Sequence, residues 1–135
     1  MRKCCKLLAI IVVLSLLLTQ LPYASAASAI SPRYIAIQSL VLDLNINAIG
    51  NAECKGSVEV RDTSLVKLSL ELQRYQNGDW ATVQTWVQTG AGIASLCKLK
   101  NVSKGYTYRL VATGYVYNSN NIVIEREEII KSSYY

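Results

Sequence analysis

The stretch VKLSLELQ, residues 66–73, alternates aliphatic and polar residues without exception. A period of two is typical of a β-strand that has one face in a core and the other in water. Asn77 and Gly78 follow, and this pair favours a tight hairpin. The stretch therefore predicts a half-buried strand that turns back into a second, antiparallel strand at 80–87.

Similar runs lie on both sides of this hairpin, separated by segments rich in Gly, Asn and Ser. The predicted strands span residues 40–46, 52–60, 66–73, 80–87, 93–99, 106–117 and 122–129. No segment keeps the helical period of 3.6 residues, and Pro occurs only at positions 22 and 32. Seven short strands predict an all-β fold, a two-sheet antiparallel sandwich, with a small closed barrel as the alternative.

One of the predicted strands has an ambiguous face. In the run 80–87, Trp80 and Trp86 share one parity while Val83 and Val87 share the other, so alternation does not say which pair is buried. In the run 93–99 we place Cys97 and Leu99 on the inward face, and in the run 52–60 we place Cys54 on the inward face.

The amino-terminal segment has the three parts of a secretory signal peptide. Arg2, Lys3 and Lys6 precede an apolar run at 7–18, and the small-residue cluster that ends at Ala26 and Ala27 follows. The run is too short to cross a bilayer core of about 30 Å as a helix. We predict a signal peptide at 1–26 cleaved between Ala26 and Ala27; an uncleaved membrane anchor is the alternative.

Cleavage would leave a secreted chain, extracellular or associated with the cell envelope. Its predicted parts are a short linker at 27–33, the sandwich at 34–131 and a C-terminal tail at 132–135. Removing the three leading bases from 14 Lys and Arg leaves 11 against 9 acids, a net charge of +2. This near-balance argues against a nucleic-acid partner, and loss of the leader argues against stable membrane insertion.

The cysteines divide between the leader and the domain. Cys4 and Cys5 precede the apolar run and leave with it, whereas Cys54 and Cys97 remain. Two cysteines in an oxidising compartment favour one disulfide, and two unpaired thiols are the alternative. A zinc site within one chain would need further ligands, which a sequence without His does not offer.

The stretch VSKGYTY, residues 102–108, resembles the turn of fibronectin type III domains in which a Tyr follows an apolar residue and a Pro-Gly pair; here Lys104 replaces the Pro. The resemblance implies a tyrosine corner, in which Tyr108 is buried and its hydroxyl bonds back to the backbone. It also implies that Leu110, Ala112, Gly114 and Val116 face the core while Arg109, Val111, Thr113, Tyr115 and Tyr117 face out.

In a fibronectin-type strand order, the strands of Cys54 and Cys97 are neighbours in one sheet. A disulfide would then tie adjacent strands. True immunoglobulin domains instead bridge their two sheets through a Cys two residues after the corner Tyr, where this chain has Leu110.

The mature chain also resembles a group of short secreted proteins of clostridial-type Gram-positive bacteria that consist of one immunoglobulin-like domain of unknown function. The shared motifs are Ser-Pro-Arg-Tyr at 31–34, the Trp80, Val83 and Trp86 spacing, and Gly-Tyr-Thr-Tyr-Arg at 105–109. This resemblance implies a seven-stranded immunoglobulin-like, fibronectin-III-like sandwich. It implies no activity.

Catalytic motifs are missing from the sequence. Without His, the Ser-His-Asp, Cys-His and His-metal arrangements cannot form. The acids alternate with bases on outward strand faces, as Glu53 and Glu59 do beside Lys55 and Arg61, which favours solvated cross-strand pairing. We therefore predict a protein that is not an enzyme and binds no cofactor or metal.

The aromatic residues are the remaining functional signal, because the chain has nine Tyr, two Trp and no Phe. A possible binding face contains Tyr115 and Tyr117, extended by Trp80 or Trp86, and is a shallow sheet face rather than an enclosed pocket. We predict a binding or adhesion module for cell-surface glycan or protein; the alternative is a structural, self-associating envelope component. An exposed aromatic cluster with acceptor side chains nearby would favour binding, and a long unguarded edge strand would favour self-association.

Overall fold

The computed structural model describes residues 36–135, in which every regular element is a β-strand. The strands are β1 (Ile37–Ile46), β2 (Asn51–Val60), β3 (Leu65–Gln76), β4 (Asp79–Ala91), β5 (Ile93–Asn101), β6 (Thr107–Tyr117) and β7 (Val123–Tyr134). The predicted leader, its cleavage site at Ala26 and Ala27, and the linker at 27–33 lie outside the described residues. Within residues 36–135 there is no helix able to cross a membrane.

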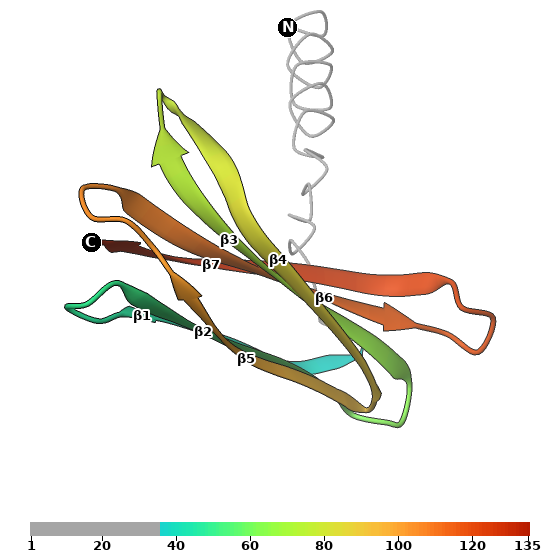
Figure 1. The fold of residues 1–135 in the computed structure, drawn as a ribbon. Coiled ribbons are helices and arrows are strands. Elements are labelled where there is room, and N and C mark those ends of the chain that lie inside the picture. Colours follow the sequence, from blue (N-terminus) through green and yellow to red (C-terminus); the bar gives the residue numbers. More distant parts are fainter. Residues whose placement is uncertain (1–35) are drawn as a thin grey trace, which may run out of the picture. The chain divides into compact units, whose positions relative to one another are not determined.

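Two antiparallel sheets form the two layers visible in Figure 1. One sheet has the order β1-β2-β5 and the other the order β4-β3-β6-β7. The predicted all-β architecture of seven antiparallel strands is confirmed, and the closed barrel is not, because the described strands form two separate sheets. The neighbouring positions of β2 and β5 were also expected.

The core lies between the sheets and follows the predicted alternation closely. Val66, Leu68, Leu70 and Leu72 of β3 are fully buried. On β2, β6 and β1 the buried or core-packed residues are Ala52, Cys54, Val58, Val60, Tyr108, Leu110, Ala112, Val116, Ile37, Leu40, Leu42, Leu44 and Ile46. Burying a side chain of Val or Leu size contributes roughly 1.5–3 kcal/mol, so these faces account for the sandwich.

The β3–β4 hairpin turns at Asn77 and Gly78, as predicted. Both residues have positive φ, 56° and 85°, which is the requirement of a type I′ turn. The turn aligns Gln76 with Asp79 and sets the register of the two strands. Asn and Gly adopt this left-handed conformation at low cost, which explains why this dipeptide decides the hairpin.

A β-bulge in β4 separates the two tryptophans. The register shifts at Val83, so that Trp86 pairs with the inward Leu70 whereas Trp80 pairs with the outward Tyr75. An extra residue in one strand reverses the alternation beyond it. Trp86 therefore packs against the core while Trp80 lies on the opposite face of the same sheet.

The predicted disulfide between Cys54 and Cys97 is wrong, because both cysteines are free. Cys54 pairs with Lys98 across the β2–β5 ladder, and Cys97 pairs with Lys55. Neighbouring residues in a strand point to opposite faces, so Cys54 is buried while Cys97 is exposed. The inward residues of β5 are Ala94 and Leu96.

The expected inward side of Leu99 is wrong for the same reason: its side chain is 70% exposed.

The carboxyl end also differs from the prediction. β7 continues to Tyr134, so residues 132–134 belong to the sheet rather than to a tail. The backbone of Tyr135 exchanges hydrogen bonds with Tyr106, and its hydroxyl donates to the Ala48 carbonyl at 3.0 Å. Pairing with β6 holds this polar end in place.

Side chains link the edges of β1 and β7 across the two sheets. The Glu125 carboxylate accepts hydrogen bonds from the backbone N–H groups of Ala36 at 2.6 Å and Ile37 at 3.0 Å. Further along both strands, Lys131 forms an ion pair with Asp43 at 2.5 Å. We call this side of the sandwich the β1–β7 seam.

Candidate binding surface

Tyr108 fixes the start of β6, the strand that carries the predicted binding residues. The side chain is 1% exposed, and its hydroxyl accepts a hydrogen bond from Ser103 N at 3.0 Å and donates one to Ser103 O at 2.9 Å. This is the bond back to the backbone that the resemblance of residues 102–108 implies for Tyr108. With Tyr108 inward, alternation turns Tyr115 and Tyr117 away from the core.

The outer face of the four-stranded sheet, the face turned away from the core, brings two cations beside these tyrosines. Lys67 on β3 pairs with Tyr115 on β6, which pairs with Arg126 on β7. The Lys67 Nζ lies 4.4 Å from the Tyr115 ring centroid and 5.7 Å from that of Tyr117. Arg126 Cζ lies 5.8 Å from the Tyr115 centroid. We call these four residues the Lys67 cluster.

The two cations differ in their partners. Arg126 forms an ion pair with Glu128 at 2.7 Å. Among residues 36–135, no carboxylate lies within ion-pair distance of Lys67, whose neighbours are the two tyrosines. A hydrogen bond with the Tyr117 side chain raises the pKa of Lys67 above its usual value, so Lys67 keeps its charge at any physiological pH.

A depression of about 370 Å³ adjoins the Lys67 cluster at Tyr117. Its walls are the loops at 61–64 and 118–122, and its lining includes Leu65 and Tyr117. The other lining residues carry hydroxyl, amide or carboxylate groups: Asp62, Thr63, Ser64, Asn118, Ser119 and Asn121. An aromatic ring beside many hydrogen-bonding groups is an arrangement that suits a polyhydroxylated ligand.

Trp80 lies on the same outer face but far from the Lys67 cluster. Its strand partner Tyr75 is eight residues from Lys67 along β3, a separation of about 27 Å. The Trp80 ring contacts Tyr75 at 5.2 Å between centroids, and Arg109 Cζ lies 4.2 Å from the Trp80 ring. Arg109 covers a ring that the sequence offered as an extension of the binding face.

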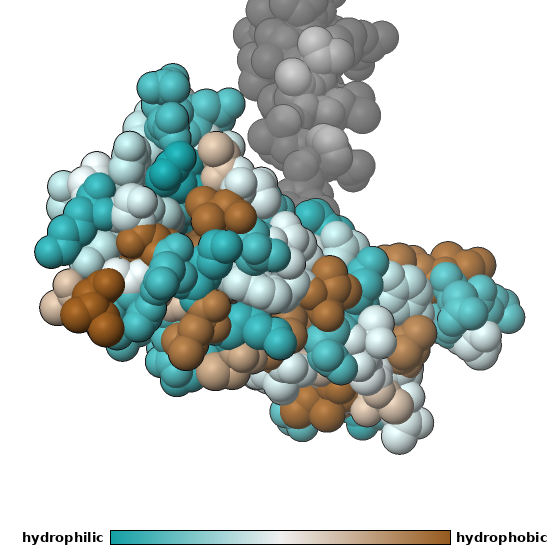
Figure 2. Space-filling model, in the orientation of Figure 1, coloured by the Kyte–Doolittle hydropathy of each residue, from teal (hydrophilic) through white to brown (hydrophobic). Residues whose placement is uncertain are grey.

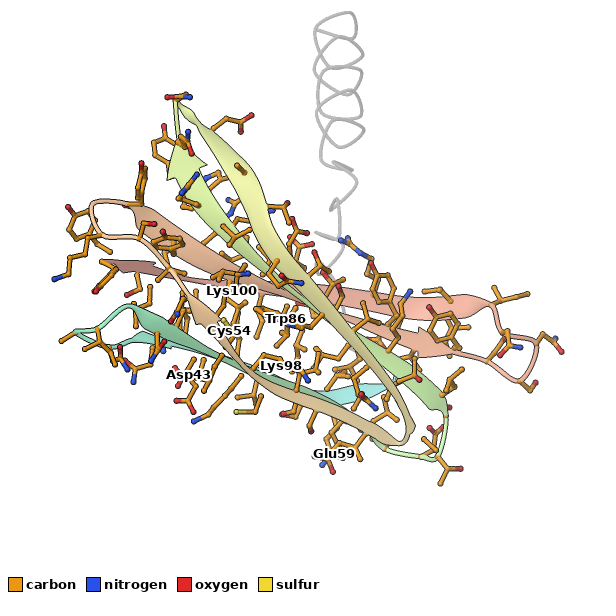
Figure 3. All side chains as sticks on the ribbon, viewed as in Figure 1. Asp43, Cys54, Glu59, Trp86, Lys98 and Lys100 are labelled. Atoms are coloured by element: carbon orange, nitrogen blue, oxygen red, sulfur yellow. The ribbon has the colours of Figure 1, made fainter. Side chains whose placement is uncertain are left out.

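Trp86 does not belong to the predicted binding face. It lies on the side of β4 that faces the other sheet, whose strand β5 carries Lys98 and Lys100 (the three residues are labelled in Figure 3). Trp86 is partly buried against the core, so packing explains this residue without a ligand. Figure 2 shows that apolar side chains on the visible side form separate patches among hydrophilic ones.

The outer face of the three-stranded sheet has a shallow depression of about 440 Å³ that sequence reasoning missed. It forms over Gly56, Ser57 and Ser95, whose small side chains leave space between taller neighbours such as Val41. Each of its two charged residues already has an ion-pair partner outside the lining, since Lys55 pairs with Glu53 at 2.8 Å and Asp43 with Lys131. This pairing leaves the depression without a charged side chain that is free to orient a ligand.

The two thiols are expected to react very differently. Burial raises the pKa of Cys54 to about 11, and only the thiolate attacks alkylating reagents. Brief iodoacetamide treatment of the native protein should modify Cys97 and spare Cys54, as read by peptide mass spectrometry. Both should react after unfolding in guanidinium. Equal labelling of the native thiols, or a peptide pair linked through them, would contradict the structure.

The described part of the chain has no cluster of three or more Cys, Asp or Glu side chains that could hold a metal ion. No protein-family model matches the chain, and no curated protein matches it in sequence. The assignment of a function therefore depends on the geometry of the Lys67 cluster and its surroundings.

Proposed function

We propose that this protein is a secreted, non-catalytic, fibronectin-III-like β-sandwich that binds a cell-surface glycan carrying acidic groups. The binding site is the Lys67 cluster together with the adjoining depression. The observation that carries the proposal is the continuity of the two: Tyr117 contacts Lys67 on one side and lines the polar depression on the other.

The acidic character of the ligand follows from the position of Lys67. A neutral sugar that stacked on Tyr115 would have to displace the ammonium group, which lies 4.4 Å from the ring centroid. A carboxylate or phosphate would instead pair with this ammonium while the tyrosine hydroxyls and the loop residues bind the sugar hydroxyls. An acidic glycan would therefore pair with the Lys67 ammonium group that a neutral glycan would have to displace.

Several observations support the remaining parts of the proposal. The tripartite leader supports secretion, although it lies outside the described residues. The pairing of β2 with β5 and the hydrogen bonds of Tyr108 support a fibronectin-III-like domain. The lack of His supports a role without acid–base or nucleophilic catalysis.

Lys67→Met and Tyr117→Ala should each weaken glycan binding about tenfold, because each removes one direct contact with the ligand. Pull-down on cell-wall glycan followed by titration with short oligosaccharides measures the loss. Carboxylated and phosphorylated oligosaccharides in separate arms identify the acidic group.

Two variants serve as controls. Lys98→Met removes an exposed cation from the other sheet, and Trp80→Ala removes an aromatic ring about 27 Å from Lys67. Both should bind like the wild type. Equal retention of the wild type and the Lys67→Met, Tyr117→Ala double variant would refute the proposed site.

A further inference from the structure

The two sheets of residues 36–135 have four edge strands, β1, β5, β4 and β7. Of these, β4 is the one that nothing guards against pairing with a strand of another chain. The β1–β7 seam closes one side of the sandwich, and β7 also carries the charged run at 125–128. β5 carries Lys98 and Lys100. β4 has no charge between Trp80 and Ala91, and Figure 1 shows it diverging from β5 beyond their shared corner.

The sequence of β4 beyond its bulge is unusually suited to pairing with another strand. QTWVQT, residues 84–89, contains β-branched and aromatic residues and neither charge, Pro nor Gly. Natural proteins usually guard such edges with Lys, Pro or a bulge. The bulge at Val83 protects only the first part of β4, and the six residues after it remain open.

The open edge presents backbone groups of alternate residues. Gln84 Nε2 donates to the Thr85 carbonyl at 3.3 Å, and Gln88 Nε2 donates to the Thr89 carbonyl at 3.1 Å. Carbonyls directed at β3 are taken by the sheet ladder, so these contacts indicate that Thr85, Val87 and Thr89 direct their N–H and C=O groups outward. In the monomer the two glutamine side chains occupy only the Thr85 and Thr89 carbonyls.

We infer that β4 pairs antiparallel with β4 of a second copy of this chain, about a two-fold axis at Val87. Val87 then lies opposite itself, and Thr85 lies opposite Thr89 of the second copy, so all three positions with outward backbone groups form hydrogen-bonded pairs. The result is one continuous eight-stranded sheet.

Charge and symmetry identify a second copy as the occupant. The only charge on β4 is Asp79, and the two-fold arrangement keeps the two Asp79 carboxylates about 50 Å apart. At the hydrogen-bonded positions the cross-strand neighbours are Val with Val and Thr with Thr, which are favourable pairs. β4 is therefore complementary to itself without a change in sequence.

Sedimentation equilibrium tests the inference. The purified protein should show a dimer mass at about 100 µM, since an interface formed by one strand pair is weak. Val87→Lys places like charges opposite each other, and Val87→Pro removes two intermolecular hydrogen bonds. Each should raise the dimer dissociation constant about tenfold or more.

The control is Val41→Lys, on the outer face of the other sheet, where Val41 is about as exposed as Val87, 53% against 55%. It should dimerise like the wild type. A wild type that stays monomeric up to about 1 mM, or a dimer unaffected by both Val87 variants, would overturn the inference.

Cross-linking locates the axis. In a Cys97→Ser background, Val87→Cys should give a disulfide-linked dimer under mild oxidation, because directly opposed residues of a hydrogen-bonded pair have Cα atoms about 5.5 Å apart. Ser69→Cys, on the inner neighbour of β4, is the matched control and should remain monomeric. Equal cross-linking of the two variants would contradict the register. Lys67→Met should leave dimerisation unchanged, which separates this test from that of glycan binding.

Discussion

Replacement of Tyr108 by Ala is expected to lower the free energy of unfolding by about 3–5 kcal/mol. Among residues 36–135 Tyr108 is the largest fully buried side chain, and its removal leaves a cavity at the point where β6 begins. The Ser103 N–H and C=O also lose their partner. Chemical denaturation followed by tryptophan fluorescence measures the change.

Tyr108→Phe separates the two causes, since it keeps the ring and removes only the hydroxyl. We expect a loss of about 1–2 kcal/mol from the two missing hydrogen bonds. A Phe variant as unstable as the Ala variant would show that the bonds rather than the packing dominate. A Phe variant as stable as the wild type would contradict the role of the corner.

Gly90→Ala is the second change with a large expected effect, a loss of about 3 kcal/mol or more. A Cβ at this position would lie 2.0 Å from the backbone oxygen of Ile93. The obstacle is backbone, which side-chain rotation cannot relieve, and it lies where the chain passes from one sheet to the other. The same denaturation experiment measures it.

The control for this change is Ala91→Ser, at the neighbouring exposed position, which should alter the unfolding free energy by no more than about 0.5 kcal/mol. A Gly90→Ala protein as stable as the control would mean that β4 and β5 do not approach as closely as described.

The predictable part of the fold is the part in which alternation and burial agree. Every aliphatic residue at 66–72 lies inward because a single register buries all of them. In β5, by contrast, apolar residues occupy both faces, as Leu96 and Leu99 do, so either register buries some of them. The ladder with β2 decides, and it turns Cys97 outward. Pairing with a distant strand is not encoded in the local pattern.

The candidate site was predictable only in part for a similar reason. The outward positions of Tyr115 and Tyr117 follow from the tyrosine corner and alternation. The position of Lys67 beside them depends on the register between β3 and β6, and the depression depends on two loops more than 50 residues apart. The bulge that separates Trp80 from Trp86 made the alternation of this run ambiguous, and its position could not be read from the pattern.

The β1–β7 seam determines how the domain would carry tension. Ile37 contacts Glu125 and Asp43 contacts Lys131, both 88 residues apart, so the two strands run in the same direction. The start of β1 and the end of β7 thus lie at opposite ends of the seam. A force that pulled these ends apart would act along the strands and load the seam contacts together in shear, instead of opening them one after another.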